Sequence, residues 1–267
     1  MTTALTLPAI QYTALDGGIA ANVREHIRLI EDAADHGSRL VVFPELSLTG
    51  YDLEGLADQS RWVTAADPRL DGLREICRRT GITAVVGAPF READGTPRLA
   101  SLALQPGGAL EAGFKVWLHG PEQQSFTPGD RTVVLDLDGW RIALAICFDT
   151  ARPVHALEAA EAGADIYAVS ALYAAGEDHR LALHLGARAM DHRMFSVLAN
   201  LGGTTKFGRS AGGSGFWGPD GLMIRQAAGT GTEVVTATLQ RDALDRYADE
   251  RDAGRSQVPK PRRADRR

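Results

Sequence analysis

Three side chains with complementary chemistry each follow an apolar run of the sequence. Glu45 follows LVVFP, Lys115 follows LEAGF, and Cys147 follows RIALAI. A thiol attacks as its thiolate, a carboxylate can accept the thiol proton, and an ammonium stabilises both the thiolate and an oxyanion formed by the attack. Together these side chains predict acyl transfer through a cysteine nucleophile, whereas each one alone is more often a buried group, a cap or a surface charge.

The elements around these residues indicate an α/β protein, because apolar runs of strand length alternate with segments of helical apolar spacing. We predict helices over 22–36, 67–80, 154–162 and 178–193, and strands over 7–10, 40–43, 82–87, 99–104, 132–137, 141–146, 166–170 and 195–200, with another that ends at 114. Beyond 200, glycine-rich segments predict antiparallel strands that end near 239. Groups at the carboxyl ends of neighbouring strands converge in open α/β sheets, so the three side chains are expected to share a crevice.

The composition is that of a folded, water-soluble domain. Of the 267 residues, 44% are hydrophobic and 24% are charged, which favours neither disorder nor a membrane protein. The N-terminal MTTALTLPAIQ lacks a basic segment followed by a long apolar run, and no later stretch reaches spanning length, so we predict a cytoplasmic protein with no membrane partner. The only two cysteines, Cys77 and Cys147, predict no disulfide framework.

The charge is unevenly distributed along the chain. The formal net charge is -5, but residues 254–267 carry six basic side chains and one Asp, so the rest of the chain is acidic. No aromatic or recognition motif accompanies the basic residues, which favours a solvated tail over an arm that binds nucleic acid or a membrane surface. No repeat or linker divides the chain, so we predict one domain over 1–240 and a C-terminal extension over 241–267 with a basic, flexible end.

The surroundings of all three side chains resemble the motifs of the nitrilase-like carbon-nitrogen hydrolases. Glu45 lies in VVFPELSLTGYD, and Lys115 lies in FKVWLHGPEQQSFTPGD, which also contains Glu122. Cys147 lies in IALAICFD, which GAD follows. The resemblance extends from the opening AIQ to RAMDHRMFSVLAN and GGSGFWGPDG and so covers nearly the whole domain. It implies the α/β fold of this family, a four-layer α-β-β-α sandwich, in an enzyme of the amidase-type branch.

The resemblance implies cysteine-dependent hydrolysis of a non-peptide C–N bond in a small amide or carbamoyl compound. Glu45 would take the proton from Cys147, whose sulfur would attack the carbonyl carbon. Lys115 and the backbone amide of Phe148 would hold the oxyanion, ammonia or an amine would leave, and water would release the acid from the thioester. Glu122 would orient Lys115 or a substrate nitrogen, unless it is only a loop charge. No metal or organic cofactor is implied, and pairing through an outer helical face predicts a homodimer or higher homo-oligomer.

The residues after the nucleophile depart from the family pattern. Nitrilases of the family commonly have Trp-Glu after the cysteine, whereas this chain has Phe148 and Asp149. The difference favours an amide or carbamoyl substrate over the alternative, a small nitrile. Four further side chains are predicted to shape the wall beside Glu45 or to reach a polar end of the substrate. These side chains are Tyr51, Arg152, His155 and Tyr173. For Arg152 and His155, a role on the helix surface is the alternative.

Three other functions have weaker support. His179, His184 and His192 suggest a metal-dependent hydrolase, but they lack the HExxH spacing of a zinc site. The glycine-rich GRSAGGSG and GGTT suggest a nucleotide-binding module, but they lack the Lys-Ser/Thr ending and the strand-to-helix setting of a phosphate-binding loop. A non-catalytic scaffold of the same fold is the third alternative, against which the complete set of nucleophile, base and cation argues. Asn200, at a predicted strand end, is expected to support the site.

Overall fold

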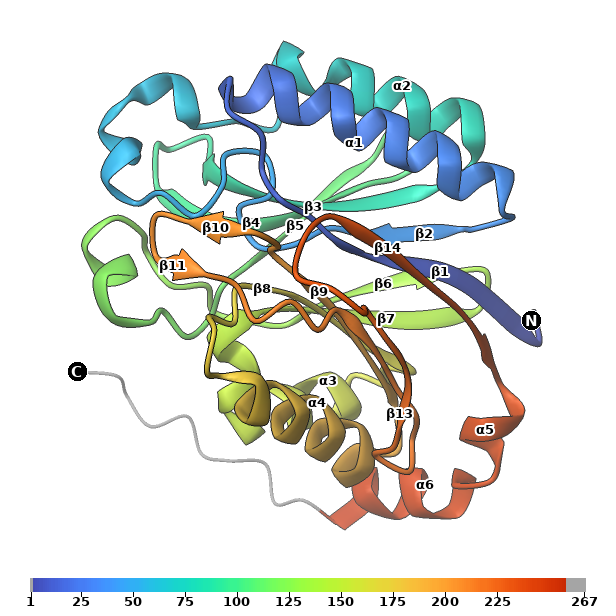
Figure 1. Ribbon diagram of the computed structural model, residues 1–267. Helices are drawn as coiled ribbons and strands as arrows, with labels where there is room; N and C mark the ends of the chain where they lie inside the picture. Colours follow the sequence, from blue (N-terminus) through green and yellow to red (C-terminus); the bar gives the residue numbers. More distant parts are fainter. Residues whose placement is uncertain (1, 258–267) are drawn as a thin grey trace.

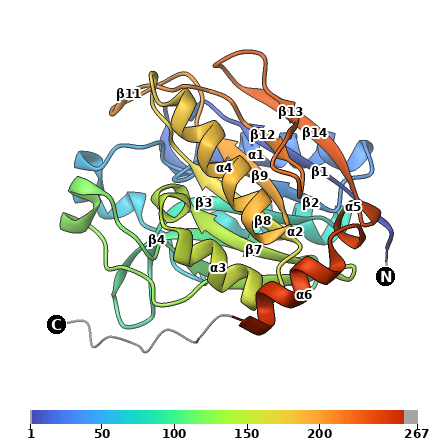
Figure 2. The same ribbon diagram turned by 90° about the horizontal axis from the view of Figure 1, so that it is seen from below.

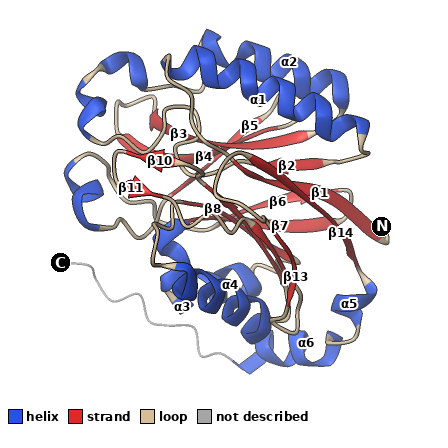
Figure 3. Cartoon of the chain, viewed as in Figure 1, coloured by secondary structure: helices blue, strands red, loops and turns tan. Residues whose placement is uncertain are grey.

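Two six-stranded β-sheets lie face to face, and helices cover the outer face of each sheet (Figures 1 and 3). The computed structural model describes residues 2–257. The first sheet is covered by α1 (Gly18–Asp35) and α2 (Asp71–Thr80), and the second by α3 (Pro153–Glu161) and α4 (Asp178–His192). This arrangement confirms the predicted four-layer α-β-β-α sandwich.

The first sheet carries the strands that lead to Glu45 and Lys115. Its order is β14 (Glu233–Gln240), β1 (Ala4–Gln11), β2 (Leu40–Val42), β3 (Thr83–Arg91), β4 (Pro97–Leu104) and β5 (Leu110–Phe114). β2 and β3 are parallel, and β4 is antiparallel to both β3 and β5. β5 therefore runs in the same direction as β2, so the residues that follow these two strands lie at one edge of the sheet.

The second sheet carries the strand that leads to Cys147. Its order is β13 (Met223–Gln226), β12 (Gly215–Trp217), β9 (Phe195–Asn200), β8 (Ile166–Ala171), β7 (Trp140–Ile146) and β6 (Val133–Leu137). β7, β8 and β9 are parallel, so the residues that follow them meet at one edge. A separate hairpin consists of β10 (Thr204–Thr205) and β11 (Gly208–Arg209). Seen from below in Figure 2, α3 and α4 lie across this sheet.

Three apolar layers pack the sandwich together. α1 and α2 pack on the first sheet around residues such as Ile30 and Leu73, the two sheets meet around Leu7 and Ile142, and α4 packs on the second sheet through Leu185. The central strands are apolar almost throughout because both of their faces are covered, as in the buried IYAVSA of β8. This double burial explains why short apolar runs were sufficient to predict these strands.

Two helix starts differ from the predictions. α1 begins at Gly18 instead of residue 22, and the helix predicted from residue 67 begins with a 3-10 turn, Pro68–Leu70, before α2. Gly17, at the N-cap of α1, has φ 107° and makes no side-chain cap. The sequence therefore lacks the usual Ser, Thr, Asp or Asn signal at the true start of this helix.

The predicted C-terminal extension contains α5 (Asp242–Asp245) and α6 (Ala248–Gln257). Leu244 is buried in the core between the sheets, and Arg251 donates to Asp165 Oδ1 at 2.7 Å. Residues 258–267, which hold most of the predicted basic end, lie outside the described residues. Within the described part of the chain, no helix combines the length and apolar character needed to cross a membrane.

Candidate active site

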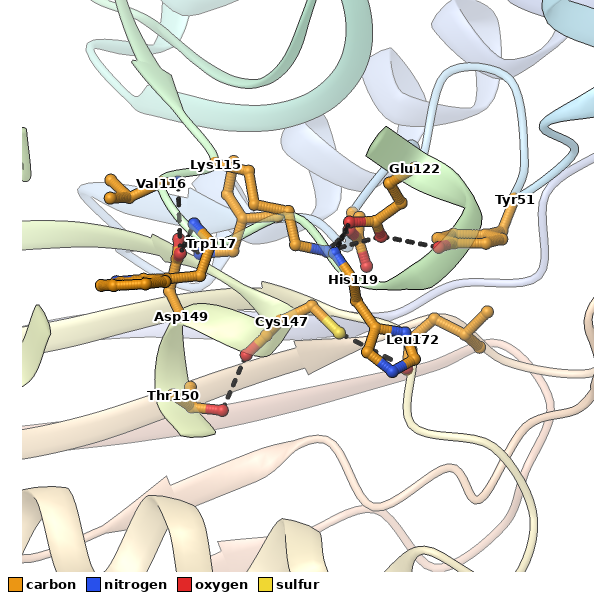
Figure 4. A network of polar contacts seen from close by, with 12 residues as sticks. Tyr51, Lys115, Val116, Trp117, His119, Glu122, Cys147, Asp149, Thr150 and Leu172 are labelled. Atoms are coloured by element: carbon orange, nitrogen blue, oxygen red, sulfur yellow. Dashed lines mark hydrogen bonds and ion pairs between the residues drawn. The ribbon is translucent and has the colours of Figure 1, made fainter. Parts of the chain in front are cut away.

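Cys147 lies at the turn between β7 and the short helix η5 (Cys147–Ala151). Its φ of 45° is in the left-handed region, which is uncommon for a residue other than glycine and marks a local backbone strain. Thr150 Oγ1 donates to the Cys147 carbonyl at 2.7 Å, and Cys147 Sγ lies 3.6 Å from the carbonyl oxygen of Leu172 (Figure 4). The turn places Cys147 in the wall of a cavity of about 230 Å³.

Asp149 connects the turn at Cys147 to the segment that follows Lys115. Its Oδ2 accepts from the Ile146 N–H at 3.0 Å, and its Oδ1 accepts from the Val116 and Trp117 N–H groups at 3.2 and 2.8 Å. These bonds join the ends of β5 and β7, which belong to different sheets (Figure 4). In the sequence, Asp149 bears on the choice between amide and nitrile substrates, but an acid at the third position of a helix is also a known capping signal, which could have indicated this role.

Lys115 lies between two carboxylates in the interior of the protein. Its Nζ is 2.7 Å from Glu45 Oε1 and 2.6 Å from Glu122 Oε1, and the three side chains are 0%, 0% and 1% exposed. Glu122, on η4 (Gly120–Gln124), also accepts from Tyr51 Oη at 2.6 Å and from the His119 N–H at 2.7 Å (Figure 4). Glu122 is therefore part of the buried network and is not a solvated loop charge.

Lys115 interacts with two buried carboxylates, and burial together with these charges shifts the pKa values of the groups in the site. Burial raises the pKa of Glu45 to about 7, although Lys115 opposes this shift. Burial alone would lower the pKa of Lys115, but Glu45, Cys147 and Glu122 reverse that effect and raise it. Burial, and after it the charge of Glu45, raises the pKa of Cys147 well above its usual range, although the charge of Lys115 acts in the opposite direction. These shifts favour the thiol form of Cys147 in the free enzyme, so a base must accept its proton before or during an attack.

The carboxylate of Glu45 has an oxygen available for that thiol. Among the described residues, Glu45 Oε2 has no hydrogen-bond partner, and interaction with the Cys147 side chain contributes to lowering the Glu45 pKa. The loop that carries Glu45 packs on β3, where the Gly87 N–H donates to Ser47 Oγ at 3.1 Å and a Cβ at Gly87 would lie 2.2 Å from the Pro44 carbonyl oxygen. Only a glycine at this position allows such a close approach.

The structure separates the four predicted substrate contacts. Tyr51 and Tyr173 line the cavity, as does Phe148, the second residue of η5, whose backbone N–H has no acceptor inside a helix at that position. The His155 side chain is buried and lies 2.9 Å from Tyr167 Oη through its Nδ1. Its Nε2 lies 3.6 Å from Asp149 Oδ2, and His155 is not among the residues that line the cavity, so this position lends no support to the predicted substrate contact.

Arg152 is also placed away from the cavity lining. Its guanidinium lies over the rings of Trp117 and Phe148, 5.1 and 4.8 Å from their centroids. The side chain is exposed and is not among the residues that line the cavity, so the predicted substrate contact of Arg152 stays a prediction beside the surface alternative. Asn200 supports the site as expected, because its Oδ1 accepts from the Tyr173 N–H at 2.8 Å.

Several residues of the cavity wall were not predicted. They belong to η5, follow β8, lie on α4 or at its N-cap, or lie on the β10–β11 hairpin and near η4, and they are His119, Thr150, Ala151, Leu172, Ala174, Glu177, Arg180, His184 and Phe207. Their position after the carboxyl end of a parallel strand is the only sequence signal that points to them. His184 was considered only as a metal ligand, but its Nδ1 is 2.9 Å from Tyr173 Oη. Among residues 2–257, no group of three or more His, Cys, Asp or Glu side chains could hold a metal ion.

The fold and the buried acid-lysine-acid network next to a strand-end cysteine define a hydrolase of the nitrilase superfamily. The chain matches the carbon-nitrogen hydrolase family over residues 7–249 and belongs to this family.

Named relatives share between a quarter and a third of their residues with this chain. The "hydrolase in pqqF 5'region" of Pseudomonas protegens is 29% identical over 243 residues, which cover 87% of this chain and 84% of the relative. An (R)-stereoselective amidase of a Pseudomonas species is 28% identical over 246 residues, with coverage of 89% and 85%. A nitrilase of Pyrococcus abyssi is 28% identical over 216 residues, with coverage of 79% and 80%.

Solved structures with the same fold include amidases. A variant of the amidase from Nesterenkonia sp. AN1 in complex with butyramide has a TM-score of 0.81 and 27% identity, covering 93% of this chain and 96% of that one. Saccharomyces cerevisiae Nit3 has a TM-score of 0.85 and 20% identity, covering 99% and 98%, and supports the fold alone.

Proposed function

We propose that this chain is an amidase that hydrolyses small amides or carbamoyl compounds through a thioester on Cys147. The observation that carries the proposal is the buried network in which Lys115 contacts both Glu45 and Glu122, beside a thiol in the wall of a small cavity. This network contains a base, a cation and a nucleophile in one place. A solved structure of a variant of the Nesterenkonia amidase has acrylamide added at its active site cysteine, which supports a reactive cysteine in a protein of this fold.

Acylation begins with a proton transfer inside the network. Glu45 accepts the proton of the Cys147 thiol while Sγ attacks the carbonyl carbon of the substrate, which forms a tetrahedral intermediate. Lys115 has three N–H donors, of which two face Glu45 and Glu122, so the third is free to stabilise the oxyanion together with the Phe148 N–H. The C–N bond then breaks, and Glu45 gives the proton to the leaving ammonia or amine.

Deacylation uses the same carboxylate a second time. Glu45 accepts a proton from a water molecule, which attacks the thioester carbon and forms a second tetrahedral intermediate at the same oxyanion position. The C–S bond breaks, the acid is released, and the thiol of Cys147 recovers its proton from Glu45. Glu122 holds Lys115 in position throughout, because its own carboxylate is fixed by Tyr51 and the His119 N–H.

A small nitrile is the second candidate substrate, since the similarity to the Pyrococcus abyssi nitrilase is close to that of the (R)-stereoselective amidase. We expect matched amides and nitriles of the same carbon chain to differ in kcat/KM, with the amide faster, because the residues after Cys147 depart from the nitrilase pattern. Ammonia release is the measurement, with Cys147→Ala as background. A faster nitrile would assign the chain to the nitrilase reaction and leave the family unchanged.

The activity should fall on the acid side of neutral pH. Glu45 acts as a base only when ionised, and its raised pKa of about 7 means that the protonated, inactive form accumulates below that pH. We expect kcat/KM for a small amide to decrease about tenfold per pH unit below about pH 6 and to level off above about pH 8. A profile that is flat between these values would contradict the assignment of Glu45 as the base.

The two cysteines should differ strongly in their reaction with iodoacetamide. Burial raises the pKa of both thiols, but Cys147 lines the cavity and has Glu45 beside it to accept its proton, whereas Cys77 is 0% exposed. We expect Cys147 to be labelled at least about tenfold faster in the folded protein, because only an accessible thiolate reacts. Peptide mass mapping over time measures both rates, with the urea-unfolded protein as control. Equal rates in the folded protein would contradict the nucleophile assignment.

Exposed apolar side chains on α4 and at the β13 hairpin form a surface that could support the predicted homo-oligomer. Large apolar side chains are exposed on α4, at Leu183 and Met190, and at the β13 hairpin, at Leu222 and Met223. The two groups are neighbours, because a Cβ on Gly221 would lie 3.0 Å from Met190 Cβ. Contiguous exposed apolar side chains often mark an association surface, which supports pairing through this helical face.

A further inference from the structure

Three side chains of the cavity wall form a series of hydrogen bonds that begins at the carbonyl of Cys147. Thr150 Oγ1 lies 2.7 Å from the Cys147 carbonyl oxygen and 2.7 Å from Tyr173 Oη. Tyr173 Oη in turn lies 2.9 Å from His184 Nδ1. Thr150, Tyr173 and His184 all line the cavity that contains Cys147. The proposed mechanism uses none of these three side chains.

The donor and the acceptor of each hydrogen bond in this series follow from the bond between Thr150 and the Cys147 carbonyl. A carbonyl oxygen only accepts, so Thr150 must donate its one hydroxyl proton to Cys147. Thr150 Oγ1 must then accept from Tyr173, which in this way uses its own single proton. Tyr173 Oη must therefore accept from His184, so the proton of the imidazole is on Nδ1.

The His184 ring consequently presents a bare nitrogen. Burial, together with the positive charges of Arg180 and Arg188, lowers the pKa of His184, so the ring is uncharged at neutral pH. With the proton on Nδ1, Nε2 is a hydrogen-bond acceptor. Among the described residues no side chain or backbone group is a hydrogen-bond partner of Nε2, and the half-buried ring forms part of the cavity wall.

The charges around this nitrogen balance one another. Arg180 also lines the cavity, but its guanidinium forms an ion pair with Glu177, whose other oxygen accepts from the Ala174 N–H at 2.9 Å. Other side chains of the cavity lining, such as Phe148 and Phe207, are apolar. The cavity lining therefore combines an uncharged acceptor, His184 Nε2, with a cation, Arg180, that is already paired, and it has little excess positive charge to attract an anion.

We propose that His184 is a specificity residue that accepts a hydrogen bond from a neutral donor, such as a hydroxyl or a second amide N–H, on the non-reacting end of the substrate. The inference rests on the proposed amidase function. A methyl group at this place leaves the nitrogen unpaired, and a carboxylate sets a negative charge against its lone pair. The preferred substrates are thus small amides with a neutral polar group at the far end.

The tautomer can be measured without turnover. Two-bond nitrogen-proton correlation spectra of the ¹⁵N-labelled Cys147→Ala protein show which ring nitrogen carries the proton, and His184→Gln in the same background assigns the signal. We expect a neutral ring with the proton on Nδ1 near pH 7.5, and a shift of Nε2 when an ω-hydroxy amide is added. A proton on Nε2, a charged ring, or an Nε2 signal that the hydroxy amide leaves unchanged would overturn the proposal.

Substrate pairs test the consequence for catalysis. Each ω-hydroxy amide of three to six carbons is compared with the methyl-terminated amide of equal length and with the corresponding carboxylate. At the best length we expect kcat/KM to be about tenfold higher for the ω-hydroxy amide than for the methyl-terminated amide. This ratio should fall to one or below in His184→Phe and should decrease in part in Tyr173→Phe. His179→Gln, at an exposed position on the same helix, should keep the ratio.

The possible failures are distinguishable. If the wild-type protein hydrolyses amides but favours the methyl-terminated or the carboxylate substrate, the role of His184 is refuted and the amidase function stands. If it hydrolyses no amide at all, the proposed function fails. The nitrogen spectra then decide the binding role of His184, because they need only the folded protein and the added hydroxy amide.

Discussion

Replacement of Glu45 by Gln should lower kcat for a small amide by about 10²–10⁴-fold, the range expected when a positioned general base is lost. Gln keeps the size of the side chain and an oxygen that can face Lys115 Nζ, which is now 2.7 Å from Glu45 Oε1. It cannot accept the proton of the Cys147 thiol or that of the attacking water. Both half-reactions should therefore slow, and any enzyme that is acylated should remain as the thioester.

Steady-state rates and intact mass together test this expectation. The mass of Glu45→Gln after incubation with a good substrate should show either the acyl adduct on Cys147 or no reaction. Glu111→Gln, at an exposed position on β5, is the matched control and should keep wild-type kcat. The acid limb of the pH profile should also be absent from the residual activity of Glu45→Gln. A near-normal kcat in this variant would refute the mechanism.

Replacement of Lys115 by Met should reduce both stability and activity. The change leaves Glu45 and Glu122 buried without the cation that contacts both of them. Breaking a buried ion pair on one side costs about 3–5 kcal/mol, and loss of an oxyanion donor costs about 10²–10³ in kcat. Lys206→Met, at an exposed position, should change the free energy of unfolding by less than about 0.5 kcal/mol.

The stability loss in Lys115→Met should depend on pH in a defined direction. Without the ammonium, burial and mutual repulsion raise the folded-state pKa of the carboxyl pair above its unfolded value. A group with a raised folded pKa favours the folded state at low pH and loses that contribution as the pH rises through the folded pKa. The difference in unfolding free energy between wild type and variant should therefore be small near about pH 5 and large near about pH 8. Urea unfolding at both values measures it, and a difference that is independent of pH would contradict the charge argument.

The sequence by itself determined most strands and helices of the fold and indicated the candidate nucleophile, base and cation. Strands buried on both faces must be apolar along their whole length, and helices that cover the outer face of a sheet must show one apolar stripe, so these elements can be read locally in the sequence. Glu45, Lys115 and Cys147 could be placed together for the same reason, since each follows such a strand and the ends of parallel strands meet at one edge. The motifs around them added the family, which the family match over residues 7–249 confirms.

Only the tertiary structure decided which other side chains reach the cavity and how the site is charged. Arg152 and His155 are near Cys147 in sequence but are not among the residues that line the cavity, whereas His184, on α4, is one of them. Protonation depends on burial and on charges brought together from distant segments. The thiol of Cys147 and the tautomer of His184 follow from the packing of two sheets and one helix, because desolvation and hydrogen-bond direction are properties of the assembled interior.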